Sequence, residues 1–175
     1  RVLFRSHLSR CGADLIELGV PFSDPLADGP TIQHSTQAAL EQGMNVSRCL
    51  EAAAQLRARG VSQPLLLMGY INPILAYGIE RYATGAAAAG VDGLIVPDLP
   101  LEESAALENA CRDSGLALVY LVSPASTPER IAALAGRTTG FLYLVSLTGV
   151  TGARSRLTGG LAEFVGRVRE SARTP

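Results

Sequence analysis

Two carboxylates, Glu17 and Asp28, are the side chains of this sequence that are best placed to do chemistry. Glu17 lies inside an otherwise apolar run, residues 15–20, and Asp28 follows in a turn-rich loop. A run that is apolar on both alternating faces is typical of a strand buried on both sides in a parallel sheet. A carboxylate in such a strand loses hydration, so it must be hydrogen-bonded, protonated or functional. A structural glutamate in the core is one interpretation, and the loop that follows favours a functional one.

That loop resembles a family signature. Residues 17–33, ELGVPFSDPLADGPTIQ, resemble the motif of the tryptophan synthase alpha subunit family without a gap. Residues 143–152, YLVSLTGVTG, form a second family-like block, and residues 68–74 and 96–104 give weaker support. The resemblance extends from about residue 11 to the C-terminus. An ungapped match of this length is far more specific than a short glycine motif, so the sequence is identified as a member of this family.

The resemblance implies a lyase that cleaves indole-3-glycerol phosphate by a retro-aldol reaction to indole and glyceraldehyde 3-phosphate in tryptophan biosynthesis. The ring carbon C3 must be protonated before the carbon–carbon bond breaks, and a base must take the proton of the side-chain hydroxyl. One carboxyl can serve both steps if apolar surroundings raise its pKa, and Glu17 matches the family residue for this role. Asp28 matches the carboxylate that stabilises the positive charge developing on the ring nitrogen. Without the motif, Asp28 could equally be a plain turn residue.

Other site residues follow only from the resemblance. Residues 148–153 are similar to the family's mobile lid, whose glycines leave backbone N–H groups free for an anion. Some members have Arg where this sequence has Leu147, so a polar closure contact by that side chain is not expected. The principal phosphate contacts of the family come after the seventh and eighth strands, which we do not find here. The substrate-binding candidates are Tyr70, Tyr143, Thr151 and Gly152.

The resemblance also implies a partner. The family works with a pyridoxal-phosphate beta subunit in an alpha2-beta2 tetramer, and no cofactor is expected in this chain. Asp24 is the carboxylate that competes with Asp28 for the catalytic role, and we assign it to the partner interface. Asp98 is expected to hold loop structure. The interface candidates are Pro21, Asp24, Pro25, Asn72 and Pro100. A rival hypothesis is a truncated, non-catalytic barrel fragment that only binds the beta subunit.

The elements that must position these residues alternate along the chain. Repeating strand and helix patterns predict a parallel α/β fold with helices outside the sheet. Periodicity alone does not separate an open sheet from a barrel, and the resemblance decides for a (β/α)8 TIM barrel with its site at the C-terminal ends of the strands. The expected strands are 14–20, 64–70, 93–98, 117–123 and 140–146. The expected helices are 32–43, 47–59, 79–89, 102–114, 128–135 and 160–171.

The barrel is expected to be incomplete. A full one needs about 250 residues and eight strands, whereas the pattern shows about five βα units, with the first unit and the last two missing. Residues 1–10 do not resemble the family, and we interpret them as a foreign lead, such as translated adapter DNA. Residues 11–175 then form a partial barrel domain. We expect these 175 residues alone to be inactive and prone to aggregation, because unpaired edge strands would be exposed.

Composition excludes several function classes. The chain has 175 residues, 47% of them hydrophobic and 18% charged, with a net charge of −1. The absence of Trp and of basic clusters argues against a nucleic-acid surface, and no apolar run approaches a membrane span. Three scattered cysteines and two histidines indicate neither a disulfide framework nor a metal site. A cytoplasmic, metal-free protein is expected.

Overall fold

A five-stranded parallel sheet forms the centre of the molecule. The computed structural model describes residues 7, 9–145, 160–172 and 175. The strands pair in the order β1-β2-β3-β4-β5, each parallel to the next. Within the described residues, β1 and β5 are therefore the two edges of the sheet. The strands are β1 (Ile16–Gly19), β2 (Leu65–Met68), β3 (Gly93–Ile95), β4 (Ala117–Val122) and β5 (Leu142–Leu144).

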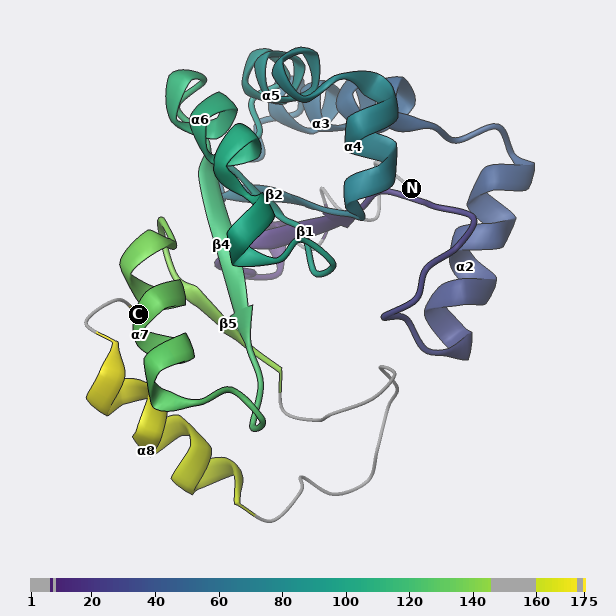
Figure 1. Cartoon of the computed structure of the whole chain (residues 1–175). Coiled ribbons are helices and arrows are strands. Elements are labelled where there is room, and N and C mark those ends of the chain that lie inside the picture. Colours follow the sequence, from purple (N-terminus) through teal and green to yellow (C-terminus); the bar gives the residue numbers. More distant parts are fainter. Residues whose placement is uncertain (1–6, 8, 146–159, 173–174) are drawn as a thin grey trace.

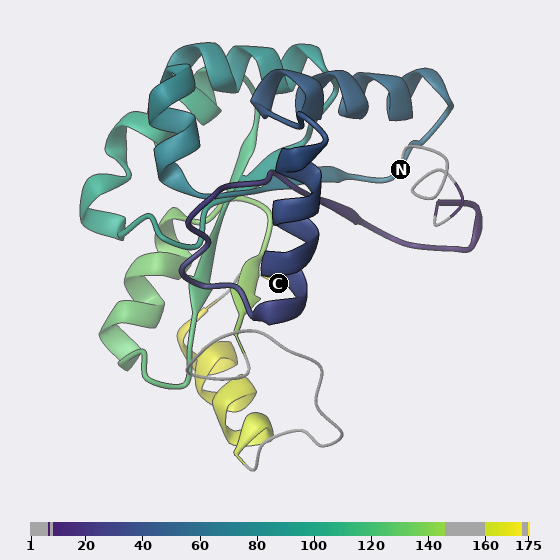
Figure 2. The same ribbon diagram turned by 90° about the vertical axis from the view of Figure 1, so that its right-hand side faces the viewer.

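Helices connect the strands and cover one face of the sheet (Figures 1 and 2). The strand order never reverses, so right-handed crossovers place every connecting helix on the same side. An open doubly wound sheet would reverse its order and carry helices on both faces. The predicted barrel-type α/β fold is thus confirmed. The helices are α2 (Pro30–Glu41), α3 (Val46–Ala58), α4 (Ile71–Tyr77), α5 (Ile79–Ala88), the 3-10 helix η1 (Leu101–Glu103), α6 (Ala105–Asp113), α7 (Pro128–Arg137) and α8 (Leu161–Ser171).

Two apolar clusters lie on opposite faces of the sheet. The larger one joins outward strand residues such as Ile16, Leu67 and Leu118 to the buried faces of the helices. The smaller one contains only residues of the strands and their immediate ends, with Leu66 and Ile95 at its centre. Because side chains alternate along each strand, this smaller cluster is the inner face of the sheet. The family resemblance places the active site at the C-terminal ends of these strands.

Helix α2 differs from its neighbours because it stands apart from the other helices (Figure 1). Ala39 is its only buried residue. Its N-terminus follows directly from the loop that carries Asp28, with Pro30 in the first turn, where a missing N–H leaves no helical hydrogen bond unmade. The position of α2 therefore depends on the same loop as the candidate site.

The observed strands are shorter than the predicted runs. The apolar pattern continues beyond the C-terminal ends of β1 and β3, but Pro21 and Pro97 have no N–H to donate to a ladder. Helix α4 was not predicted; Pro73 lies in its first turn, where proline is tolerated. Helix α3 begins after Asn45, not after the expected Ser47, because the Asn45 side chain accepts a hydrogen bond from the N–H of Arg48 (3.0 Å).

The N-terminal end of the sheet is held together by the guanidinium of Arg57 on α3. Its Nη2 lies 2.5 Å from Oδ2 of Asp92, the residue that precedes β3. The same carboxylate oxygen accepts a hydrogen bond from the N–H of Leu65 at the start of β2 (2.7 Å). The other guanidinium donors reach the carbonyl oxygens of Val61 (2.7 Å), Gln63 (2.8 Å) and Gly90 (2.7 Å). One side chain thus ties a helix to the beginnings of two strands.

Candidate active site

Glu17 occupies the inner face of β1, in register with Leu66 of β2. The expected burial of both faces of this strand is wrong: Ile16 and Leu18 are buried, but Glu17 and Gly19 are exposed, since nothing in the described part of the chain covers the inner side of this edge. No described residue donates a hydrogen bond to the Glu17 carboxylate. Its surroundings nevertheless remove enough water to raise the pKa of Glu17 above its ordinary value. A carboxyl of this kind is suited to proton transfer.

Tyr143 lies on the same inner face, on β5. Burial raises the pKa of its phenol, and the negative charge of Glu17 raises it further. Strands β1 and β5 are opposite edges of the sheet, and both residues are directed to its inner face. The structure therefore brings together two of the residues singled out from the sequence.

The rest of the inner face is apolar. By strand alternation, Glu17 is the one carboxylate that the described strands present there. An apolar wall of this kind suits a flat aromatic ring and keeps the dielectric low around the carboxyl. The lining side chains are Leu15, Leu66, Met68, Ile95, Val119, Leu121, Phe141 and Tyr143.

Asp28 is held by Tyr70, which comes from the end of β2. The Tyr70 hydroxyl donates to Oδ2 of Asp28 (2.9 Å) and accepts from the N–H of Ala27 (3.0 Å). The ring of Tyr70 is buried (5% exposed) and lies 5.6 Å from that of Phe22. Burial, the hydrogen bond to Asp28 and the nearby carboxylates raise the pKa of Tyr70 to about 12, so its hydroxyl remains a donor at neutral pH.

The two loop carboxylates face different surroundings. Asp28 is half-buried and turned towards Tyr70, whereas Asp24 is exposed and accepts a hydrogen bond from the neighbouring Ser23 hydroxyl (2.5 Å). The N–H of Asp28 donates to the carbonyl of Pro25 (3.1 Å), and Gln33 of α2 donates to the carbonyl of Asp28 (2.8 Å). The loop thus directs Asp28 inward and leaves Asp24 at the surface.

Asp98 follows β3 and reaches the beginning of α4. Its Oδ1 accepts a hydrogen bond from the N–H of Ile71 (2.9 Å), the first residue of that helix. Tyr70 is the N-cap residue of α4, and its own side chain makes no cap hydrogen bond because it is directed to the Asp28 loop. Asp98 therefore supplies the cap, which agrees with the structural role expected for it.

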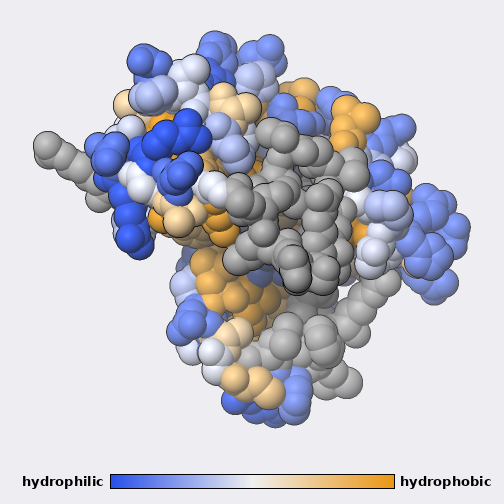
Figure 3. All heavy atoms as spheres, turned by 90° about the horizontal axis from the view of Figure 1, so that it is seen from below, coloured by the Kyte–Doolittle hydropathy of each residue, from blue (hydrophilic) through white to orange (hydrophobic). Residues whose placement is uncertain are grey.

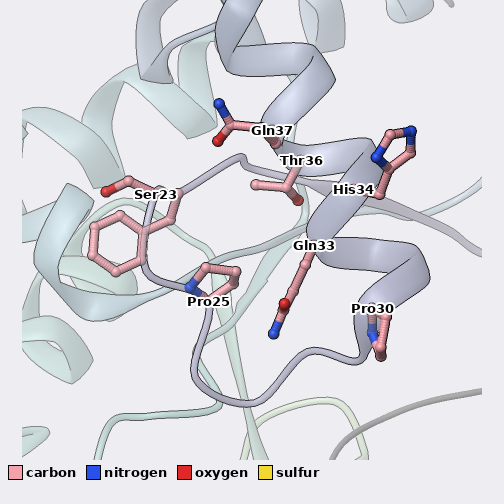
Figure 4. A pocket seen from close by; sticks show the side chains of 8 residues that line it. Ser23, Pro25, Pro30, Gln33, His34, Thr36 and Gln37 are labelled. Carbon is pink, nitrogen blue, oxygen red and sulfur yellow. The ribbon is translucent and has the colours of Figure 1, made fainter.

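A cavity of about 380 Å³ lies between the Asp28 loop and α2. Figure 4 shows Ser23 and Pro25 on the loop side, with Gln33, Thr36 and Gln37 directed towards them from the helix and His34 pointing away. Leu26 of the same loop is 84% exposed. Seen from below, apolar side chains also gather at the surface of the molecule (Figure 3). An exposed Leu beside a cavity is a feature of contact surfaces.

The expected interface residues share one end of the sheet. Pro21 and Pro25 follow β1, Asn72 is exposed in the first turn of α4 after β2, and Pro100 is exposed just before η1 after β3. Thr151 and Gly152, expected to bind substrate, and Leu147 lie outside the described residues. Among the residues that are described, no three His, Cys, Asp or Glu side chains could hold a metal ion together.

Comparison with known proteins decides the family. The model of the tryptophan synthase alpha chain family matches residues 4–175. The chain belongs to the tryptophan synthase alpha chain family. The alpha chain of Chloroflexus aurantiacus is 52% identical over 168 residues, which are 96% of this chain and 63% of that protein. That of Citrifermentans bemidjiense is 54% identical over 169 residues, 97% of this chain and 63% of its own length.

Solved structures agree with this tryptophan synthase alpha chain assignment. A Mycobacterium tuberculosis tryptophan synthase structure matches 99% of this chain and 66% of its own, with a TM-score of 0.91 and 42% identity. A tryptophan synthase alpha chain from Legionella pneumophila matches 99% of this chain and 62% of its own, with a TM-score of 0.85 and 34% identity. The chain thus spans a little under two thirds of the length of the two curated alpha chains named above. No helix within the described ranges is long and apolar enough to cross a membrane.

Two contacts of this tryptophan synthase alpha chain site were not predicted from the sequence. Tyr70 was expected to line the substrate pocket, but its hydroxyl is occupied by Asp28 and Ala27. Asp98 was expected to hold loop structure, and the partner it was not expected to have is the N–H of Ile71 at the start of α4. Both contacts join segments that follow different strands, so no local sequence pattern predicts them. The one available signal was that Tyr70 and Asp98 each directly follow a strand run, where loops of neighbouring units meet.

Proposed function

We propose that this chain carries the lyase site of a tryptophan synthase alpha chain, which cleaves indole-3-glycerol phosphate to indole and glyceraldehyde 3-phosphate in tryptophan biosynthesis. The observation that carries the proposal is Glu17: it is the carboxylate of the inner sheet face, it accepts no hydrogen bond from the described residues, and its pKa is raised. A buried structural glutamate would need a partner, whereas Glu17 is exposed on the inner face and can meet a ligand there. Membership of the family supports the choice of reaction.

Glu17 would move one proton in each direction. Its carboxylic acid gives a proton to C3 of the indole ring, which makes the ring a leaving group in the next step. The carboxylate then takes the proton of the hydroxyl next to the bond that breaks. The carbon–carbon bond electrons return to the ring, indole leaves, and the former hydroxyl oxygen becomes the aldehyde of glyceraldehyde 3-phosphate. A raised pKa serves both steps, because the group is protonated in one and a competent base in the other.

Asp28 would stabilise the charge that the first step creates. Protonation at C3 places positive charge on the ring nitrogen, and a carboxylate beside the N–H stabilises that state more than the neutral substrate. Tyr70 engages Oδ2 of Asp28, which orients the group and leaves Oδ1 for the substrate. Tyr143 would line the pocket close to Glu17, while Thr151 and Gly152 would close over the substrate.

The partner would be a beta subunit that contains pyridoxal phosphate, in an alpha2-beta2 tetramer. The support is the exposed loop after β1, with Asp24 and Leu26 at the surface, and the cavity between this loop and α2. Asn72 and Pro100 extend the same surface onto the next two loops. The chemistry assigned to Glu17 and Asp28 needs no cofactor in this chain. The exposed thiol of Cys11 is in keeping with a reducing, cytoplasmic location.

The test is a comparison of the two loop carboxylates in the complete gene product that carries this sequence. Indole release from indole-3-glycerol phosphate is measured for the parent, Asp28→Asn and Asp24→Asn. We expect Asp28→Asn to lower kcat by roughly 10²–10³-fold, the cost of one electrostatic stabiliser, and Asp24→Asn to keep it.

Asp24→Asn is a matched control because it makes the same chemical change in the same loop. It should instead weaken activation by the beta subunit. If Asp24→Asn is inactive and Asp28→Asn is normal, the two roles are reversed. If the parent binds the beta subunit but releases no indole, the binding-only hypothesis replaces the enzyme.

A further inference from the structure

We propose that Asp98 is a positioning residue for Asp28 and acts through the first turn of α4 and the hydroxyl of Tyr70. The proposal rests on the function proposed above for its catalytic consequence, and on geometry alone for the positioning. Asp98 and Asp28 belong to loops that follow different strands, β3 and β1, and the residues between them in space belong to the segment after β2.

The first step is the contact between Asp98 and α4. The N–H of Ile71 is one of the first donors of this helix, which have no partner within the helix itself. Oδ1 of Asp98 accepts it at 2.9 Å, across 27 positions of sequence. Because Tyr70 is the N-cap residue and its side chain makes no cap hydrogen bond, the start of α4 depends on Asp98 for this interaction. Removing the carboxyl leaves a partly buried donor without its partner.

The second step is the restricted path of the chain from β2 into α4. The N–H of Gly69 donates to the carbonyl of Ile95 (3.1 Å), so the residue before Tyr70 is tied to β3. A Cβ atom at Gly69 would lie only 3.0 Å from Cβ of Val20, so the end of β2 packs tightly against the end of β1. Tyr70 therefore sits between two fixed neighbours, Gly69 and the capped Ile71, and its backbone position determines where its ring goes.

The third step is the double contact of the Tyr70 hydroxyl. It donates to Asp28 and accepts from the N–H of Ala27, the residue before it, so it fixes both the side chain and the backbone of the loop. The ring is packed beside Phe22 of the same loop. Two hydrogen bonds to one oxygen tolerate little displacement, because their strength falls steeply with geometry. A shift at the start of α4 is thus passed to Asp28.

The experiment is site-resolved amide hydrogen exchange by NMR on the complete gene product. In Asp98→Ala, the amides of Ile71 and of Ala27 should both exchange faster, by roughly threefold to tenfold, as expected for the loss of one hydrogen bond. Asp98→Asn should restore both, because its amide oxygen can still accept from Ile71. In Tyr70→Phe, the amide of Ala27 should exchange faster, whereas the amide of Ile71 should stay protected. The reason is that Tyr70 lies between α4 and Asp28 in the proposed order, so its hydroxyl is not needed for the contact between Asp98 and Ile71.

Glu103→Ala is the matched control. Glu103 is an exposed acid on η1, a few residues from Asp98, and its side chain makes no hydrogen bond or ion pair with the described residues. Glu103→Ala should leave the exchange rates of the Ile71 and Ala27 amides unchanged. The proposal is overturned if Asp98→Ala exposes Ile71 but leaves Ala27 as protected as in the parent, because Asp98 would then be only a helix cap. It is equally overturned if neither amide responds.

Kinetics give a second, independent readout. Asp98→Ala and Tyr70→Phe should each lower kcat, and the double variant should be no slower than Tyr70→Phe alone, because both changes act through one contact. Effects that multiply in the double variant would contradict a shared route. A parent protein without lyase activity would refute the proposed function, whereas the exchange measurements would still decide whether Asp98 positions Asp28.

Discussion

The two ends of the sheet use carboxylates in opposite ways. At the N-terminal end, Asp92 is paired with Arg57 and also accepts the N–H of Leu65. On the inner face that leads to the C-terminal end, Glu17 accepts no hydrogen bond from the described residues, and its pKa is raised. In a barrel fold, the N-terminal end serves stability and the C-terminal end serves catalysis. The comparison shows that pairing, more than burial, separates a structural carboxylate from a functional one.

Asp28 lies between these extremes. One of its oxygens is engaged by Tyr70, which comes from the segment after a different strand, β2. Such an arrangement holds a catalytic group in place without neutralising it, because a phenol carries no charge at neutral pH when its pKa is about 12. A partner such as Arg57 would instead compensate the negative charge that Asp28 needs for its proposed role.

The largest expected effect is on catalysis at Glu17. In the complete gene product, Glu17→Gln keeps the shape of the side chain and removes the proton donor and acceptor. We expect kcat for indole release to fall by roughly 10²–10⁴-fold, the range for a general acid–base group. Steady-state rate measurements at saturating substrate give kcat. Activity within about tenfold of the parent, about 1.4 kcal/mol in barrier, would exclude Glu17 as the catalytic group.

The opposite end of the sheet should respond in stability. Arg57→Ala removes an ion pair and three hydrogen bonds to backbone carbonyls, so we expect the free energy of unfolding to drop by roughly 2–4 kcal/mol. Denaturant titration measures this loss. The kcat of the protein that remains folded should match the parent, since Arg57 belongs to helix α3 on the outer side of the sheet and Glu17 lies on the inner face. A loss of kcat without a loss of stability would remove the contrast between the two ends.

The smallest expected effect is a gain in stability at Glu17. A carboxyl whose folded pKa is raised favours folding fully only below its unfolded pKa, and this contribution is lost as pH rises through the folded value. The parent therefore carries a cost at neutral pH that the uncharged Glu17→Gln does not. Glu17→Gln should unfold at higher denaturant concentration than the parent at pH 7, and the difference should vanish below about pH 4. Equal stability at both pH values would mean that the pKa is not raised.

Much of the fold could be predicted from local pattern. The continuous apolar runs of β2 and β4, and Thr127 with Pro128 at the start of α7, were sufficient to place these elements within a few residues. Helix α4 was missed because a proline in its first turn resembles a loop. The wrong expectation of a doubly buried β1 arose because apolar sequence on both faces cannot reveal whether the inner face is covered.

The candidate site was predicted in its residues but not in its contacts. Glu17 and Asp28 stand out from the sequence because one interrupts an apolar strand and the other belongs to a specific loop motif. That Asp28, and not Asp24, turns inward was decided by Tyr70, which lies 42 positions away. The assignments of Thr151 and Gly152, and the boundary near residue 10, stay predictions.

The amino-acid sequence by itself determined the order of strands and helices, the apolar strands and the two carboxylates of the candidate site, because these depend on side-chain type and on near neighbours. Only the tertiary structure decided which polar groups meet. The contacts of Tyr70 with Asp28, of Asp98 with Ile71 and of Arg57 with Asp92 depend on strand register and on how loops of successive units pack. Register is a property of paired strands, so no single segment of sequence contains it.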